Sequence, residues 1–113
     1  MKNVLPKKSK EIESILIAFK KALNDIYFGN MKQTILFGSY ARGNFHPESD
    51  IDLLVVLENM EDPFAEIDKI SDIKFEFMLK YNIVISCLFA DAKKMKLRNE
   101  PVYYNIEREG VLL

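Results

Sequence analysis

The stretch "ILFGSYARGNFHPESDIDLLVVL", residues 35–57, contains two apolar runs separated by a polar loop. The first run ends at Gly38-Ser39, and the second begins beside Asp50 and Asp52. The second run is almost continuously apolar and rich in β-formers, which is typical of a strand covered on both faces. We therefore expect two strands joined by a loop that carries the polar residues.

The two aspartates make this loop chemically unusual. Side chains alternate between the faces of a strand, so Asp50 and Asp52 should point the same way, with Cα atoms roughly 6.5 Å apart. Two carboxylates this close repel each other and resist burial unless a cation or water reaches them. Mg²⁺ prefers oxygen ligands and commonly binds carboxylates together with substrate phosphates. The spacing suits one shared ion, or two ions about 3.5–4 Å apart.

The Gly38-Ser39 pair is a candidate phosphate site. Glycine at the end of a strand permits a sharp turn and lets an anion approach the main chain. If Ser39 opens a helical turn, its backbone N–H groups and hydroxyl can hold phosphate oxygens. Arg42 lies one turn further on and can neutralise another phosphate charge.

The chain as a whole has the composition of one folded domain, residues 1–113. Sixteen basic and seventeen acidic residues give a net charge of −1, so nucleic acid is not expected as the main partner. The single cysteine, Cys87, lies in an apolar run and suits a reducing compartment. No apolar stretch approaches the ~20 residues that cross a bilayer. We expect a cytoplasmic protein with no membrane partner.

Hydrophobic periodicity predicts alternating helices and strands. Helical spacing of apolar residues predicts helices over 9–28 and 64–80, the first capped by Ser9 and ended by Gly29-Asn30. Strands are predicted at 32–37, 51–57 and 82–90, and a final helix from Pro101 to Gly110. This order indicates an α+β fold with two layers.

Gly38-Ser39, ten intervening residues and then Asp50-x-Asp52 resembles the signature of the nucleotidyltransferase superfamily that includes polymerase β-type enzymes. The wording "GSYARG" and the short length are similar to the minimal nucleotidyltransferases (MNT). Gly-Ser alone and Asp-x-Asp alone are weak signals, but their spacing between two strands is a strong joint one. The resemblance extends to the closing "NIEREGVLL". It implies the nucleotidyltransferase fold, a small mixed sheet of three to four strands packed by helices.

The resemblance also implies an activity. Gly38, Ser39 and Arg42 would bind the nucleotide's phosphates, and Asp50 and Asp52 would be the catalytic carboxylates that hold Mg²⁺, as two ions. An acceptor hydroxyl attacks the α-phosphate of ATP or another NTP, AMP is transferred, and pyrophosphate leaves. Such proteins are typically paired with a helical HEPN protein, as antitoxin to an RNase toxin. The acceptor would then be a hydroxyl on that partner, for example a tyrosine.

One position departs from the family pattern. The family usually supplies a third carboxylate from the next core strand, and the matching residue here is Ser86. Asp91 and Glu76 are the available substitutes. This departure keeps two other hypotheses open: a catalytically degenerate nucleotide-binding module that neutralises or scaffolds a partner, and a subunit completed by another chain. Base preference and oligomeric state are left open.

Several other residues have structural interpretations that outweigh functional ones. His46 is expected to be an exposed loop residue, and the basic run 93–98 a solvated helix face. Tyr103 and Tyr104 are expected to serve core and rim packing. Tyr40 follows the phosphate site directly, so a position near the nucleotide stays open.

Overall fold

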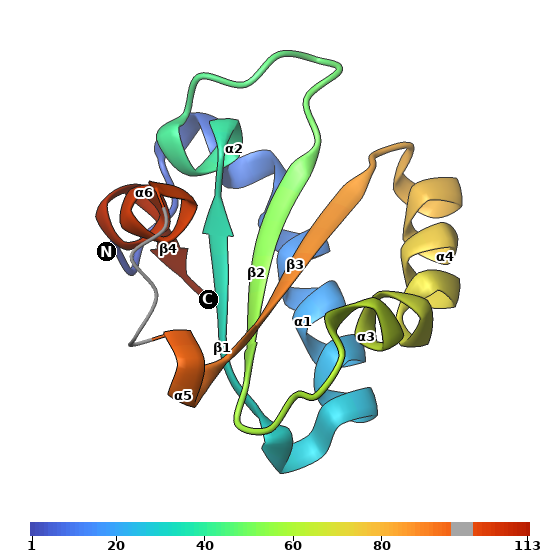
Figure 1. The fold of residues 1–113 in the computed structure, drawn as a ribbon. Coiled ribbons are helices and arrows are strands. Elements are labelled where there is room, and N and C mark those ends of the chain that lie inside the picture. The colour runs from blue at the N-terminus through green and yellow to red at the C-terminus, as the bar shows by residue number, and fades with distance from the viewer. Residues whose placement is uncertain (96–100) are drawn as a thin grey trace.

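A mixed four-stranded sheet forms the centre of the molecule. The computed structural model describes residues 1–95 and 101–113. The strands are β1 (Met31–Phe37), β2 (Ile51–Leu57), β3 (Ile85–Asp91) and β4 (Val111–Leu112), in the spatial order β3-β2-β1-β4. β1 is antiparallel to both β2 and β4, whereas β2 and β3 are parallel. Figure 1 shows α1, α3 and α4 on one face and α6 on the other, which confirms the predicted α+β class.

The first helix, α1 (Glu13–Tyr27), follows a 3₁₀ helix, η1 (Lys7–Ile12), and ends before a second one, η2 (Phe28–Asn30). The prediction that Ser9 caps α1 is wrong. Ser9 is fully buried inside η1, and its hydroxyl donates a 2.6 Å hydrogen bond to the carbonyl oxygen of Tyr40. A serine hydroxyl can form a hydrogen bond with whichever backbone group lies near it, and here that group belongs to a segment distant in the sequence.

The predicted helix over 64–80 is two helices, α3 (Pro63–Lys69) and α4 (Ser71–Tyr81). The break is at Ile70, whose backbone has φ −102° and ψ 3° and whose side chain is fully buried. Hydrogen bonds still cross the junction, from Ile70 N to Glu66 O and from Lys74 N to Ile70 O. The chain therefore changes direction between α3 and α4, as Figure 1 shows, and Ile70 is seated in the core.

Each face of the sheet has its own hydrophobic core. The larger core lies under α1 and α4 and contains Leu53, Val55 and Cys87 from the sheet with Phe19 from α1. The smaller core lies under α6 (Pro101–Glu109), where Ile106 packs on β1 and β2. Cys87, from the apolar run of β3, is buried in the larger core.

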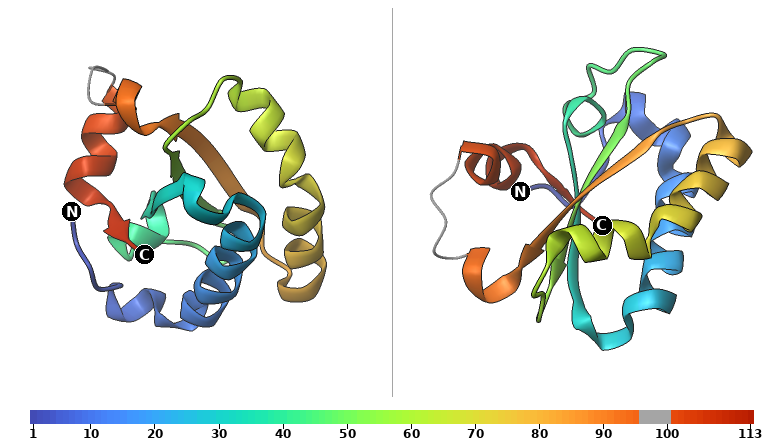
Figure 2. Two further views of the ribbon diagram at one scale, coloured as in Figure 1. Left: turned by 90° about the horizontal axis from the view of Figure 1, so that it is seen from below. Right: turned by 45° about the vertical axis from the view of Figure 1, so that its right-hand side comes forward.

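The strand β4 was not predicted. It has two residues, too few for a sequence pattern, and it forms because Gly110 ends α6 and returns the chain to β1. Lys2 extends this edge, donating its N–H to Gly110 O at 2.9 Å and accepting from Leu112 N at 2.8 Å. Figure 2 shows the N-terminal segment running beside this edge.

A short helix, α5 (Ala92–Met95), contains exposed Lys93 and Lys94 of the predicted basic run, whose residues 96–98 lie outside the described chain. No helix in the described ranges is long and apolar enough to span a membrane.

Candidate active site

The residues at the two ends of the polar loop lie against each other. β1 and β2 pair so that Phe37 is opposite Asp52, which places Gly38 beside that aspartate. Gly38 has φ +76°, and a Cβ built on it would overlap the carboxylate of Asp52. Two independent reasons therefore require glycine here: the left-handed backbone and the close approach of a carboxylate.

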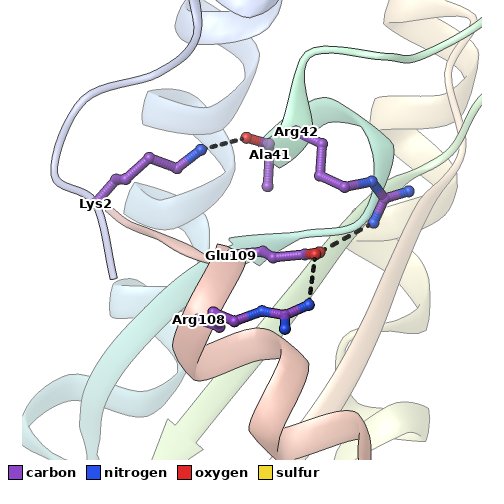
Figure 3. A network of polar contacts seen from close by, with 5 residues as sticks. All are labelled: Lys2, Ala41, Arg42, Arg108 and Glu109. Carbon is purple, nitrogen blue, oxygen red and sulfur yellow. Dashed lines mark hydrogen bonds and ion pairs between the residues drawn. The ribbon is translucent and has the colours of Figure 1, made fainter.

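Ser39 opens a helical turn, as the sequence predicts. The turn is α2 (Ser39–Arg42), closed by Gly43 at φ +79°, whose N–H donates to Ser39 O at 2.9 Å. Ser39 is half-buried, and Arg42 is exposed at the end of the turn. The Lys2 ammonium also supports α2, donating to the carbonyl oxygen of Ala41 at 2.9 Å (Figure 3).

The two aspartates occupy different environments. β2 begins at Ile51, so Asp50 precedes the strand and is exposed, whereas Asp52 lies inside it and is half-buried. Burial raises the pKa of Asp52, and the negative charge of Asp50 raises this pKa further, while the positive charge of Arg42 lowers it. The structure thus brings Asp50 and Arg42 within electrostatic reach of Asp52, beside Gly38.

A cleft of about 480 Å³ adjoins these residues. It lies between the end of β1 and the last turns of α6 and is lined by Phe37, Gly38, Arg42, Asn105, Ile106, Arg108 and Glu109. Glu109 accepts from two guanidinium groups, Arg42 Nη1 at 3.4 Å and Arg108 Nη2 at 3.3 Å (Figure 3). Sequence reasoning missed the α6 residues, because nothing local to "NIEREG" indicates that it packs beside α2.

Comparison with known families decides what this arrangement belongs to. The model of the nucleotidyltransferase domain family matches residues 7–112, which include all the residues named above apart from Lys2. The chain belongs to the nucleotidyltransferase domain family.

Similar nucleotidyltransferases are known from archaea. MJ0141 of Methanocaldococcus jannaschii, whose name proposes protein adenylyltransferase activity, is 37% identical over 86% of this chain and 98% of its own length. MJ0604 of the same organism is also named for a proposed protein adenylyltransferase activity. It is 34% identical over 89% of this chain and 96% of its own length. Protein adenylyltransferase MntA of Thermococcus cleftensis is 44% identical over 44% of this chain and 48% of its own length.

Solved structures share the nucleotidyltransferase fold. A toxin–antitoxin complex with AMP-PNP aligns with a TM-score of 0.61 at 19% identity, over 83% of this chain and 68% of the other. A nucleotidyltransferase structure from Sulfolobus solfataricus aligns with a TM-score of 0.58 at 21% identity, over 95% and 86% of the two chains. These likenesses support the fold.

The carboxylates of this nucleotidyltransferase suit a hard divalent cation. Asp50 and Asp52 offer oxygen ligands. Burial and the charge of Asp50 disfavour the ionised form of Asp52, and a bound cation would offset both effects by stabilising that form. In the described part of the chain, no group of three or more His, Cys, Asp or Glu side chains could hold a metal. Two protein carboxylates fit Mg²⁺, which usually completes its shell with water and substrate phosphates.

Ser86 lies beside Asp52. The parallel register of β2 and β3 pairs these two residues, so their side chains share a face of the sheet. Ser86 is exposed there, between Val84 and Leu88, which are 45% and 41% exposed. The sheet position next to Asp52 therefore presents a neutral hydroxyl on an open surface.

Neither substitute carboxylate reaches Asp52. Asp91 pairs with Leu57 at the opposite end of β3, about 16 Å along the strand from Ser86. Its carboxylate accepts from the backbone N–H groups of Met60, Lys93 and Lys94. Glu76 lies on α4, which covers the other face of the sheet. Asp91 thus has a capping role, and the site has two carboxylates among the described residues.

The remaining candidates have mainly structural positions. Tyr40 is buried and stacks on Phe45 with ring centroids 4.2 Å apart. Burial raises its pKa, and the charges of Glu11 and Asp50 add to the effect. His46 is an exposed loop residue, as predicted. Tyr103 packs against the smaller core, and Tyr104 is exposed under the guanidinium of Arg108.

Proposed function

We propose that this protein is a Mg²⁺-dependent nucleotidyltransferase that transfers AMP from ATP to an acceptor hydroxyl in the cytoplasm. One observation carries the proposal: Gly38 has no side chain at the point where the Asp52 carboxylate approaches it. The Gly38-Ser39 turn, proposed to bind phosphate, therefore lies against Asp52, one of the two carboxylates proposed to hold the metal. Transfer of a nucleoside monophosphate needs both at one phosphorus atom.

Each residue has a defined part in this reaction. The α2 turn at Gly38 and Ser39 binds phosphate oxygens, and Arg42 offsets a further charge from the wall of the cleft. Asp50 and Asp52 would hold Mg²⁺, which neutralises charge on the phosphates when it is bound. The acceptor oxygen bonds to the α-phosphorus in line, the bond to pyrophosphate breaks, and the acceptor proton leaves to solvent.

The acceptor is proposed to be a hydroxyl, such as a tyrosine, on a helical HEPN partner for which this protein acts as the antitoxin. The names of the relatives support transfer to a protein, and a protein partner is supported by two structural neighbours that are toxin–antitoxin complexes. The open surface at Ser86 leaves room for an acceptor from another molecule to approach Asp52.

Labelled ATP tests the proposal directly. The protein is incubated with the product of the neighbouring gene, α-labelled ATP and Mg²⁺, and label on the partner is measured. Transfer should be lost in Asp50→Ala/Asp52→Ala and retained in Asp25→Ala, a change of an exposed carboxylate on α1. Equal labelling by the wild type and the double variant would refute the enzymatic function.

The neutral Ser86 favours a second candidate, a catalytically degenerate module that binds nucleotide and neutralises its partner by contact. Two carboxylates bind a divalent cation less strongly than three. This site should therefore bind Mg²⁺ more weakly than a site with the family's three carboxylates. The degenerate module predicts no label transfer, together with partner inhibition that survives Asp50→Ala/Asp52→Ala. Inhibition that depends on those aspartates and on ATP would exclude it.

A further inference from the structure

The outer side of α3 and α4 carries an exposed apolar stripe that the fold does not use. It consists of Phe64 and Ile67 on α3 with Phe75, Met78 and Leu79 on α4, here named the ridge. Phe64, Phe75 and Leu79 are 76%, 57% and 69% exposed. α4 is held to the core by its other side, where Phe77 packs edge-on against Phe19 with ring centroids 5.0 Å apart. The ridge therefore contributes little to holding the helix in place.

The ridge residues share one side of each helix. On α3 they are three residues apart, and on α4 they follow at intervals of 3 and 1. Within each helix these spacings return to the same side, and the two helices adjoin at Ile70. Contiguous apolar surface of this kind on a soluble protein marks an interaction site.

A row of carboxylates follows one flank of the ridge. Asp68, Asp72 and Glu76 succeed one another at four-residue intervals and are all exposed. Like charges at this spacing repel one another on a helix. In residues 1–95 and 101–113 these three side chains have no ion pair: Lys69 is engaged by Glu66 at 3.1 Å, and Lys80, which follows Glu76 at the same interval, lies over the Tyr81 ring at 5.3 Å. The three carboxylates therefore have no charge partner in the described chain, and a partner protein can supply one.

We propose that the ridge and its acidic flank bind another protein through a surface that is apolar and flanked by lysine or arginine. The negative row repels nucleic acid and anionic lipid. It also disfavours a two-fold contact between copies of this chain, because each ridge would bring its carboxylates toward the other's. The surface lies on the sheet face opposite Asp52 and Ser86, so binding here requires no nucleotide and stands apart from the transfer reaction.

The test uses a labelled helical peptide with leucine along one side and lysine along the other, followed by fluorescence anisotropy. Phe75→Ser/Leu79→Ser should weaken its binding about tenfold or more, as expected for anchor residues. The matched control is Val4→Ser/Ile17→Ser, another pair of exposed apolar residues, each 66% exposed. It should bind the peptide as the wild type does.

A charge exchange separates specific docking from general stickiness. Asp72→Lys/Glu76→Lys should lose the leucine–lysine peptide and gain a leucine–glutamate peptide that the wild type does not bind. The ridge variants should keep the wild-type unfolding midpoint, because the changed side chains are exposed. Absence of peptide binding, equal loss in the control pair, or dimerisation of the wild type that Phe75→Ser/Leu79→Ser abolishes would each overturn the proposal.

Discussion

Asp52 and Ser86 are direct neighbours across the parallel pair of β2 and β3, with both side chains on the sheet face that α6 partly covers. This is the position from which a third carboxylate would reach a cation held by Asp50 and Asp52. The structure therefore shows where the departure from the family pattern matters. Under the proposed function it would affect the acceptor side of the site, because the Gly38-Ser39 turn lies on the other side of Asp52, next to β1.

Ser86→Asp should make the protein more dependent on Mg²⁺. Without the cation, a third carboxylate beside Asp52 adds repulsion and should lower the free energy of unfolding by about 1 kcal/mol. With Mg²⁺ bound, the loss should be recovered, since the cation binds the folded site. Urea unfolding with and without Mg²⁺ measures both. Ser86→Asn, equal in size but neutral, is the control, and a Mg²⁺ response no larger than that of the control would contradict the expectation.

Gly38→Ala should damage both the fold and the site. A Cβ at φ +76° is strained and overlaps the carboxylate of Asp52, so we expect a loss of at least about 2 kcal/mol. Gly29→Ala is the matched change, since a Cβ there meets nothing within 4 Å, and it should stay within about 0.5 kcal/mol of the wild type. Equal urea midpoints for the two variants would disprove the close-approach argument.

The pH dependence of stability should differ in sign at Asp52 and Asp91. Burial and Asp50 raise the pKa of Asp52, so its contribution to stability is fully present below the ordinary aspartate pKa and falls as pH rises through the higher folded pKa. Asp52→Asn removes that fall. The free energy of unfolding of Asp52→Asn minus that of the wild type should therefore be larger at pH 7 than at pH 3.

Asp91 provides the opposite case. Its burial opposes ionisation, but backbone N–H groups of Lys93, Lys94 and Met60 outweigh this and lower its pKa. Its contribution is present above the ordinary aspartate pKa and is lost as pH falls through the lower folded pKa. Asp91→Asn should therefore cost more at pH 7 than at pH 3. Parallel pH profiles for the two variants would show that the assigned environments are wrong.

Cys87 should be unreactive in the folded protein. Burial raises the pKa of its thiol to about 12, which leaves almost no thiolate near neutral pH. A thiol reagent at pH 8 should label it only after unfolding, at the rate at which the chain opens. Rapid labelling of one thiol per folded chain would place Cys87 at an accessible surface instead.

Sequence reasoning predicted the elements with strong local patterns. The strands at 51–57 and 32–37 and the final helix from Pro101 follow from composition and turn residues that act within a few positions. The same reasoning placed Asp50 and Asp52 at the start of a strand and Ser39 at a helical turn. The resemblance matched Ser86 to the position of the family's third carboxylate, and the register of β3 places Ser86 beside Asp52.

The features that sequence reasoning missed depend on contacts between distant segments. Ser9 resembles a helix cap locally, but its hydroxyl meets the carbonyl of Tyr40, thirty-one residues away in the chain. The break at Ile70 reflects seating in the core, and α4 has apolar residues on two sides, so periodicity could not separate its buried side from the ridge. Arg42 and Glu109 meet only because α6 returns to α2.

The pairing of Phe37 with Asp52 has a consequence for how the site assembles. The Gly38-Ser39 turn and both aspartates belong to one hairpin, whose pairs are 15 to 26 residues apart in the chain, fewer than the 34 between Asp52 and Ser86, so the hairpin can form earlier in folding. Ser86 joins them only after a long chain segment with two helices has closed into a parallel pair. A newly made chain should therefore acquire its paired carboxylates before it acquires the strand that, in this protein, adds no charge to them.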